Sequence, residues 1–151
     1  VESSYKRYKK LLTDKKLELS STIKGKEIFT KTCGACHQLY GEGGILGPEL
    51  TGSNRSNIDY LLSNILEPSA DIQDDYKMVV ITIRDGRTYL GTVASDTDRH
   101  LVLNILGQGK AKINKSDIQS REDTPNSMMP AGLLDNMNDQ EILDLVAYLK
   151  S

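Results

Sequence analysis

The sequence predicts a mainly α-helical, single-domain protein with a small antiparallel β insertion at about residues 77–118. Apolar residues recur at helical spacing on both sides of this stretch, whereas apolar and polar residues alternate within it. The chain has 151 residues, about the length of one domain. Its hydrophobic share of 38% and aromatic share of 5% are low. We therefore expect something other than side chains to help fill the core.

Residues 1–22 are predicted to form a helical linker or extension. Their apolar side chains form one narrow stripe at helical spacing, made of Tyr5, Tyr8, Leu12 and Leu19. Positive side chains outnumber negative ones over the first 20 residues. Because Lys15 interrupts the stripe, we expect a solvated helix rather than a membrane or partner anchor.

A second helix is predicted at residues 23–32, after the good N-cap residues at positions 20–22. The Gly-rich stretch at 41–48 is too broken for regular structure and is expected to form a loop around something. A third helix is predicted at 58–66, where the apolar residues share one side, and Pro68 ends it.

The insertion is predicted to be a small antiparallel sheet. Val79, Ile81 and Ile83 alternate with more polar residues, and Asp85-Gly86 favours a two-residue type I′ turn. Further strands are expected at 87–94, 101–106 and 110–114, with turns at 96–99 and 107–109.

A last helix is predicted near the end of the chain. Asn138 can cap it, and Glu141 lies at the offset of a capping box. Apolar residues from Ile142 to Leu149 then repeat at i, i+3, i+4 and i+7.

Charge and hydropathy exclude two classes of partner. The net charge is -2, without the basic excess of a nucleic-acid-binding protein, so we expect no nucleic-acid partner. No apolar run approaches the ~20 residues that cross a bilayer, so we expect no membrane span in this chain.

Both cysteines lie in Cys33-Gly34-Ala35-Cys36-His37, which has the spacing of a covalently attached c-type haem. Two thiols separated by two residues can each add to one vinyl group of a single porphyrin. The next residue presents an imidazole to the iron. The motif predicts one haem c bound through Cys33 and Cys36, with His37 as a metal ligand.

Three other interpretations of the cysteine pair have less support from the sequence. A redox-active pair needs no following histidine and usually lies between a strand and a helix, whereas a helix is predicted before this motif. Zinc needs four ligands, and only His37 and the distant His100 remain to complete the set. A disulfide between residues three apart closes a very small loop and stabilises little.

A thioether sulfur as sixth iron ligand favours Fe(II) and raises the reduction potential. Met78 is predicted in a strand, and Met137 lies beside the cap of the last helix. Met128 and Met129 lie in an irregular stretch where a loop could cross the far face of a haem. Pro130 biases the residue before it toward an extended backbone, so Met129 is the predicted ligand and Met128 the alternative.

These motifs together resemble a class I cytochrome c. They are Gly25, Phe29, residues 33–37, Gly47-Pro48, Met129-Pro130 and the final helix at 145–149. Residues 43–52, 65–69, 85–86, 127–133 and 144–149 more specifically resemble the haem-binding domain common in planctomycete and verrucomicrobial proteins. The resemblance covers residues 23–151 and implies a helical fold around a covalent haem, with the sheet at 77–118 inserted.

The resemblance implies further site residues. The carbonyl of Pro48 is expected to accept a hydrogen bond from His37 Nδ1 and so orient the ring. Arg55 matches a position that could neutralise a haem propionate, with a solvated surface arginine as the alternative. Gly25 and Phe29 are expected to meet the last helix near Tyr148.

The function implied by the resemblance is electron transfer, with the iron cycling between Fe(II) and Fe(III), and not enzymatic catalysis. Haem attachment outside the cytoplasm implies a periplasmic or otherwise exported protein. We expect the C-terminal module of a larger redox protein, joined through residues 1–22, or else a separate mature cytochrome. The expected partner is a redox protein or a fused redox domain.

Two other functions compete with electron transfer as interpretations of the sequence. One is a haem-based ligand sensor or peroxidase-like enzyme, in which the sixth ligand leaves the iron. The other is a haem-free interaction module built on the inserted sheet.

Overall fold

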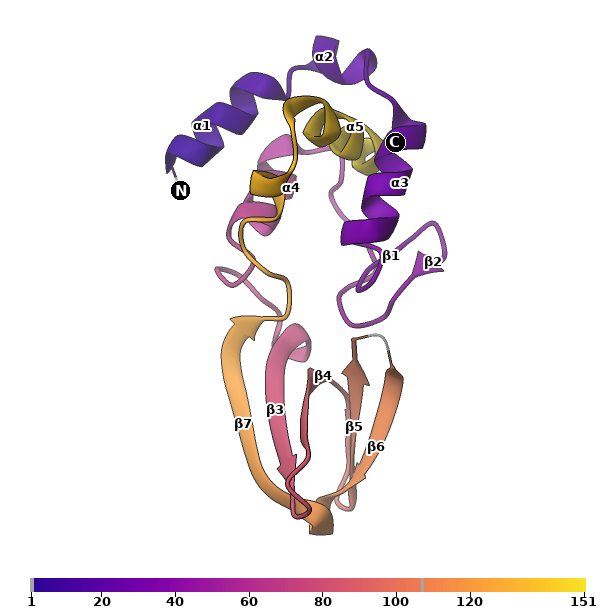
Figure 1. Ribbon diagram of the computed structural model, residues 1–151, viewed down its shortest axis with the longest axis vertical. Coiled ribbons are helices and arrows are strands. Elements are labelled where there is room, and N and C mark those ends of the chain that lie inside the picture. The colour runs from indigo at the N-terminus through magenta and orange to yellow at the C-terminus, as the bar shows by residue number, and fades with distance from the viewer. Residues whose placement is uncertain (1, 107) are drawn as a thin grey trace.

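Helices gather at one end of the molecule and a β-sheet forms the other, as Figure 1 shows. This computed structural model describes residues 2–106 and 108–151. The helices are α1 (Glu2–Leu11), α2 (Asp14–Glu18), α3 (Thr22–Thr32), α4 (Ile58–Leu66) and α5 (Asp139–Lys150). Short 3-10 helices lie at η1 (Asp74–Tyr76), η2 (Lys115–Asp117) and η3 (Leu133–Asn136).

The helix ends confirm the predicted caps. The Ser21 side chain accepts from Lys24 N at the start of α3. Asn138 and Glu141 form the predicted capping box of α5. Local polar groups therefore satisfy the first orphan N–H groups, and the starts of α3 and α5 follow from the sequence alone. The N-terminal segment, by contrast, was predicted as one helix but forms the two helices α1 and α2.

A five-stranded antiparallel sheet makes up the other end of the molecule. Its strands are β3 (Lys77–Ile83), β4 (Thr88–Asp96), β5 (His100–Ile105), β6 (Gly109–Asn114) and β7 (Ile118–Ser127), in the order β6-β5-β4-β3-β7. η2 connects β6 to β7. The sheet has its own apolar cluster, formed by Val79, Ile81, Ile83, Leu101, Leu103 and Ile113.

The prediction of a mainly α-helical protein is wrong, because the structure contains 38% helix and 28% strand. The predicted insertion ended at residue 118, but β7 extends the sheet to Ser127. This strand lies at an edge and pairs only with β3, so Thr124 alone is buried along it. A strand with one buried side chain has no apolar alternation to detect, and Pro125 argues further against a strand.

The first hairpin lies where Asp85-Gly86 predicted it, but its turn differs. Gly86 N donates to the Ile83 carbonyl at 2.9 Å, and Ile83 N donates to the Arg87 carbonyl at 3.0 Å. Gly86 has a φ of 93°, whereas Asp85 has no positive φ. A type I′ turn needs positive φ at both central residues, so the loop is a three-residue turn with a bulge at Gly86. The turn predicted at 107–109 includes Gly107, which lies outside the described residues.

The N-terminal helices pack on the helical core instead of extending from it. Tyr8 is 1% exposed, and Leu12 and Leu17 are also buried. The Tyr8 hydroxyl lies 3.3 Å from Asp135 in η3, to which it donates. Lys9 pairs with Asp59 at the start of α4. α1 therefore packs against the segment that follows the Met128-Met129 pair.

α3 and α5 cross at close range at Gly25. A Cβ at this position would lie 1.9 Å from the Asp144 carbonyl oxygen. One turn later the Phe29 and Tyr148 rings meet edge to face, with centroids 5.6 Å apart. The expected contact of Gly25 and Phe29 with the last helix is confirmed.

Among the residues that the structure describes, no helix combines the length and apolar character that a bilayer crossing requires.

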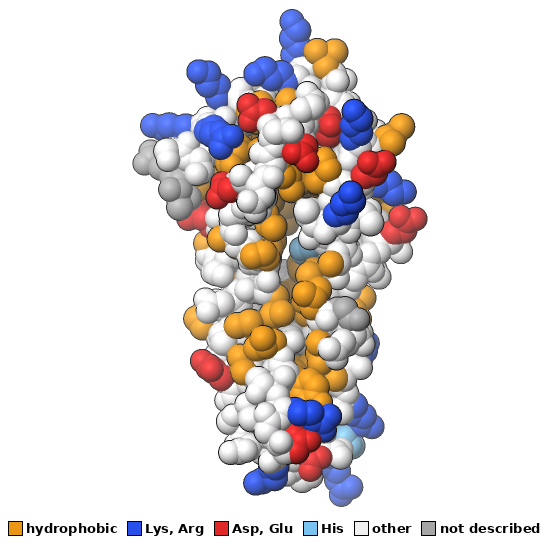
Figure 2. All heavy atoms as spheres, in the orientation of Figure 1, with side chains coloured by type: hydrophobic (Ala, Val, Ile, Leu, Met, Phe, Trp, Pro, Cys, Tyr) orange, Lys and Arg blue, Asp and Glu red, His pale blue; other side chains and the backbone are white. Residues whose placement is uncertain are grey.

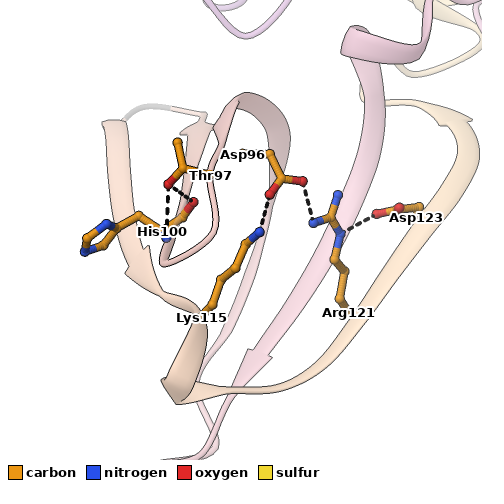
Figure 3. A network of polar contacts seen from close by, with 6 residues as sticks. All are labelled: Asp96, Thr97, His100, Lys115, Arg121 and Asp123. Atoms are coloured by element: carbon orange, nitrogen blue, oxygen red, sulfur yellow. Dashed lines mark hydrogen bonds and ion pairs between the residues drawn. The ribbon is translucent and has the colours of Figure 1, made fainter.

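The far end of the sheet carries a network of charged side chains, drawn in Figure 3. The Asp96 carboxylate accepts from Lys115 at 2.5 Å and from Arg121 at 3.0 Å. Arg121 also donates to Asp123 at 2.9 Å. The hydrogen bonds from Lys115 and Arg121 lower the pKa of Asp96. The network joins the end of β4 to η2 and β7.

Asp96→Asn is expected to lower the free energy of unfolding by about 1 kcal/mol at neutral pH, because two partly exposed ion pairs lose their shared acceptor. The folded-state pKa of Asp96 is depressed, so this stability is complete above its unfolded pKa of about 3.9. It is lost as the pH falls through the folded value. Urea unfolding at neutral pH and near pH 3 measures both effects.

Asp98→Asn is the control, since Asp98 is exposed and makes no ion pair with any residue described. Its unfolding free energy should match wild type at both pH values. An Asp96→Asn deficit that is equally large at neutral and acid pH would show that the carboxylate charge is not responsible.

Candidate haem site

The Cys33–His37 motif forms a turn directly at the end of α3. Cys33 caps the helix, and its carbonyl accepts from Cys36 N at 3.1 Å and from His37 N at 2.9 Å. Gly34 N donates to the Phe29 carbonyl at 2.7 Å. The helix thus orients a compact turn that holds both thiols and the imidazole in consecutive positions.

Both thiols are free and protonated at neutral pH. Burial raises the pKa of Cys33, against which the Thr32 hydroxyl, 3.5 Å from the sulfur, acts in the opposite direction. Burial also raises the pKa of Cys36. Catalytic thiols have lowered pKa values, so this environment does not favour the redox-active pair.

The His37 ring is held in one orientation and one protonation state. Its Nδ1–H donates to the Pro48 carbonyl at 2.7 Å, which is the contact that the cytochrome resemblance implies. Burial lowers the pKa of His37, and the bond to Pro48 opposes this shift. The imidazole is therefore neutral at pH 7, with its proton on Nδ1 and the lone pair of Nε2 available to a metal.

The Gly-rich loop lies against this turn at contact distance. Gly47 N donates to the Cys36 carbonyl at 2.8 Å, and a Cβ at Gly47 would lie 2.7 Å from His37 Cε1. A Cβ at Gly44 would lie 2.1 Å from the Ala35 carbonyl oxygen. The glycines thus let the loop pass over the motif without displacing the imidazole.

Two short strands hold the loop against the motif. β1 (Gln38–Leu39) pairs with β2 (Glu42–Gly43) in an antiparallel hairpin directly after His37. Leu39 at its base is buried in the helical core. The hairpin therefore turns the chain back toward the cysteines.

Met129 lies two residues after the end of β7. Its backbone N–H donates to the Ser127 hydroxyl at 3.0 Å, and Ser127 N donates to the Ser69 hydroxyl at 3.1 Å. Met129 and Cys33 are both half-buried against the same core of helices. Met128 is half-buried but is not among the side chains packed on that core.

Arg55 lies at the C-terminal end of α5. Its guanidinium donates to the carbonyls of Leu149 at 2.7 Å and Ser151 at 2.9 Å, and it lies over the Tyr40 ring at 5.1 Å. A cation there caps the last carbonyls and interacts favourably with the helix dipole. The propionate contact of Arg55 stays a prediction.

His100 lies away from the motif, at the start of β5 near the charged network of Figure 3. No group of three His, Cys, Asp or Glu side chains within residues 2–106 and 108–151 could hold a metal ion. The zinc alternative therefore has no ligand set in this part of the chain.

The residues of the site fit a covalently bound haem. The thiols have the required spacing, and the neutral imidazole presents Nε2. Figure 2 shows the surface hollowed between the helices and the sheet, with hydrophobic side chains gathered around the hollow. The porphyrin of a haem is a flat apolar ring that carries two polar propionate groups, and such a molecule suits an apolar hollow.

Sequence reasoning missed the contact between the sheet and the Gly-rich loop. The Thr92 hydroxyl of β4 donates to the Leu46 carbonyl at 3.1 Å, between residues 46 positions apart. No spacing or motif identifies this pair. Ser127 was also missed, although a serine two residues before Met129 is a recognisable site for a local side-chain-to-backbone bond.

Comparison with known proteins identifies one family. The family model for cytochrome c matches residues 23–151, from the start of α3 to the end of the chain. No curated protein matches the sequence. Cys33 and Cys36 have the CxxC spacing through which this family binds haem. The chain therefore belongs to the cytochrome c family, whose domains bind haem and transfer electrons.

Proposed function

We propose that the protein is an electron carrier in which Cys33 and Cys36 hold one haem c, and His37 and Met129 are the axial ligands of its iron. The observation that carries this proposal is the hydrogen bond from His37 Nδ1 to the Pro48 carbonyl at 2.7 Å. This bond selects the tautomer that a metal-binding imidazole needs and fixes the ring orientation. When bound, the haem supplies an iron that alternates between Fe(II) and Fe(III).

The two thiols have one chemical task in this proposal. Each S–H adds across a vinyl C=C bond, so that sulfur bonds to one carbon and hydrogen to the other, and no oxidant is consumed. The buried, protonated state of Cys33 and Cys36 suits addition of intact thiols. No side chain then has to act as acid, base or nucleophile during electron transfer.

Met129 is the proposed sixth ligand because two neighbours restrain it. Ser127 holds its backbone N–H, and Pro130 restricts its backbone to extended conformations. If His37 and Met129 both stay bound in the Fe(II) and Fe(III) states, little structural reorganisation accompanies each electron transfer. Met128 lacks the contacts that join Met129 to the helical core.

Cytochrome c domains are usually exported or periplasmic, and we place this protein there. We further propose a C-terminal module of a larger redox protein, of the planctomycete and verrucomicrobial type, which accepts electrons from a redox partner or a fused domain. The inserted sheet supports this assignment, because that subfamily is expected to carry one.

The test is to produce the protein with the haem attachment machinery and to measure its mass and absorption. We expect the mass to increase by one haem, and the ferric protein to show the red-edge band that reports a bond from iron to thioether sulfur. Met129→Ala should lose this band completely and should lower the reduction potential, because a soft ligand that favours Fe(II) is removed.

Met128→Ala is the matched control and should keep both the band and the potential. Loss of the band in Met128→Ala instead would assign the ligand to the neighbouring residue. A wild-type ferric protein that lacks the band and readily binds cyanide or CO would favour the sensor or peroxidase-like function. A correctly produced but colourless protein would refute haem binding.

A further inference from the structure

One buried hydrogen bond joins the inserted sheet to the loop that holds His37. The Thr92 hydroxyl donates to the Leu46 carbonyl at 3.1 Å. Thr92 is 1% exposed and Leu46 is 3% exposed, so water does not compete for the bond. A buried carbonyl that loses such a donor pays the cost of its desolvation.

Thr92 is not part of the apolar core of the sheet. Its neighbour Val93 pairs with Leu103, which is fully buried among the core residues of the sheet. Successive side chains of a strand point to opposite faces, so Thr92 lies on the other face. Thr92 is nevertheless buried, and its bonded neighbour there is the loop that carries Leu46.

The hydrogen bond from Thr92 fixes the orientation of one peptide group in the Gly-rich loop, the one between Leu46 and Gly47. The Leu46 carbonyl and the Gly47 N–H belong to the same planar unit, and they point in opposite directions because the peptide bond is trans. The carbonyl accepts from Thr92 on the sheet, and the N–H donates to Cys36 of the haem motif at 2.8 Å. The sheet and the motif therefore hold this peptide from both sides.

The next residues lie against the imidazole. Gly47 contacts the His37 ring, where a Cβ would lie 2.7 Å from Cε1. Pro48 then accepts the His37 Nδ1–H at 2.7 Å. Only the 47–48 peptide separates the 46–47 peptide from the Pro48 carbonyl, so rotation of the 46–47 peptide would shift Gly47 and Pro48 and move this carbonyl away from Nδ1.

We infer that Thr92 is a positioning residue for the proximal iron ligand, so that the inserted sheet tunes the reduction potential through the His37–Pro48 hydrogen bond. This inference rests on the proposed function, because its main readout needs a haem bound through His37. A strong bond from Nδ1–H makes the imidazole a better donor and favours Fe(III). Weakening it favours Fe(II) and raises the potential.

The test uses the haem-loaded protein and three variants. Thr92→Val keeps the shape and removes the donor, and Thr92→Ser keeps the donor. Thr88→Val is the control, because it makes the same change at the exposed end of the same strand. Redox titration gives the midpoint potential, and NMR gives the exchange rate of the His37 Nδ1 proton with solvent.

We expect Thr92→Val to raise the Fe(II)/Fe(III) ratio at a fixed solution potential about threefold, which corresponds to roughly 28 mV at 59 mV per tenfold change for one electron. Exchange of the Nδ1 proton should be about tenfold faster. Thr92→Ser should restore both values, and Thr88→Val should leave them unchanged. A purely structural role would alter stability but neither of these two quantities.

A haem-loaded Thr92→Val protein with the wild-type potential and exchange rate would overturn the inference. Wild-type protein that binds no haem would instead refute the proposed function. If Thr92→Val fails to fold, the wild-type Thr92 hydroxyl proton still tests the anchor. Slow exchange of that proton with solvent supports the bond, and free exchange overturns the inference.

Discussion

Gly25→Ala is expected to lower the free energy of unfolding by about 3 kcal/mol, which corresponds to a fall in Tm of roughly 6 to 12 °C. The new Cβ would lie 1.9 Å from the Asp144 carbonyl oxygen and 2.7 Å from Tyr148 Cβ. The nearest atom is helix backbone, which cannot rotate away as a side-chain tip can. α3 and α5 must therefore separate at their crossing.

The sign of this effect is informative, because alanine is the better helix former. In an isolated helix the same change would stabilise by about 0.8 to 1 kcal/mol. A net loss in chemical denaturation therefore shows that the clash between α3 and α5 exceeds this gain, and it underestimates the cost of the clash by the same amount. Separation of the helices should also weaken the packing of Phe29 on Tyr148, whose rings lie 5.6 Å apart.

Gly52→Ala is the matched control. A Cβ at Gly52 meets no atom within 4 Å, and its backbone is not in the positive-φ region. This variant should be as stable as wild type or up to about 1 kcal/mol more stable. If Gly25→Ala behaved in the same way, the close crossing of α3 and α5 would be disproved.

Tyr8→Ala is expected to lower the free energy of unfolding by about 3 to 5 kcal/mol, as other large aromatic deletions in cores do. The ring is 1% exposed among residues of the helical core. Its hydroxyl, 3.3 Å from Asp135, lies in an environment where burial raises the pKa of the phenol. Urea unfolding monitored by far-UV circular dichroism measures the loss.

Two further variants separate the contributions of Tyr8. Tyr8→Phe should cost only about 0.5 to 1.5 kcal/mol, since it removes the hydroxyl bond but keeps the packed ring. Tyr60→Ala, at a side chain that is 39% exposed on α4, should cost much less than Tyr8→Ala. Equal losses for Tyr8→Ala and Tyr60→Ala would mean that α1 is a solvated linker.

The N-terminal segment shows how far an amphipathic pattern can be interpreted. The predicted stripe is right for Tyr8 and Leu12, which are buried, but wrong for Leu19, which is 81% exposed, because the chain breaks between α1 and α2. The narrow stripe suggested solvation, but the Tyr8 ring is 1% exposed within the helical core. The partner of that ring, Asp135, is 127 residues away and has no signature in the sequence.

The haem site likewise combines residues that the sequence predicted with contacts that only the fold shows. The spacing of Cys33, Cys36 and His37 predicted the haem motif, and the resemblance supplied Pro48 as its neighbour. The resemblance suggested that Arg55 could neutralise a propionate, which stays a prediction, and the sequence did not indicate that its guanidinium caps the end of α5. A long, flexible cation can reach several acceptors, and only the folded chain selects among them.

The sequence by itself determined the features that depend on neighbouring residues: the capped helices, the hairpin at Asp85-Gly86 and the cysteine pair followed by histidine. Their physical causes act within a few residues, so they survive without knowledge of the fold. The tertiary structure alone decided that residues 118–127 form an edge strand and that Thr92 bonds to Leu46. Both depend on hydrogen bonds between distant segments, and backbone pairing and single buried hydroxyl groups leave no periodic pattern in a sequence.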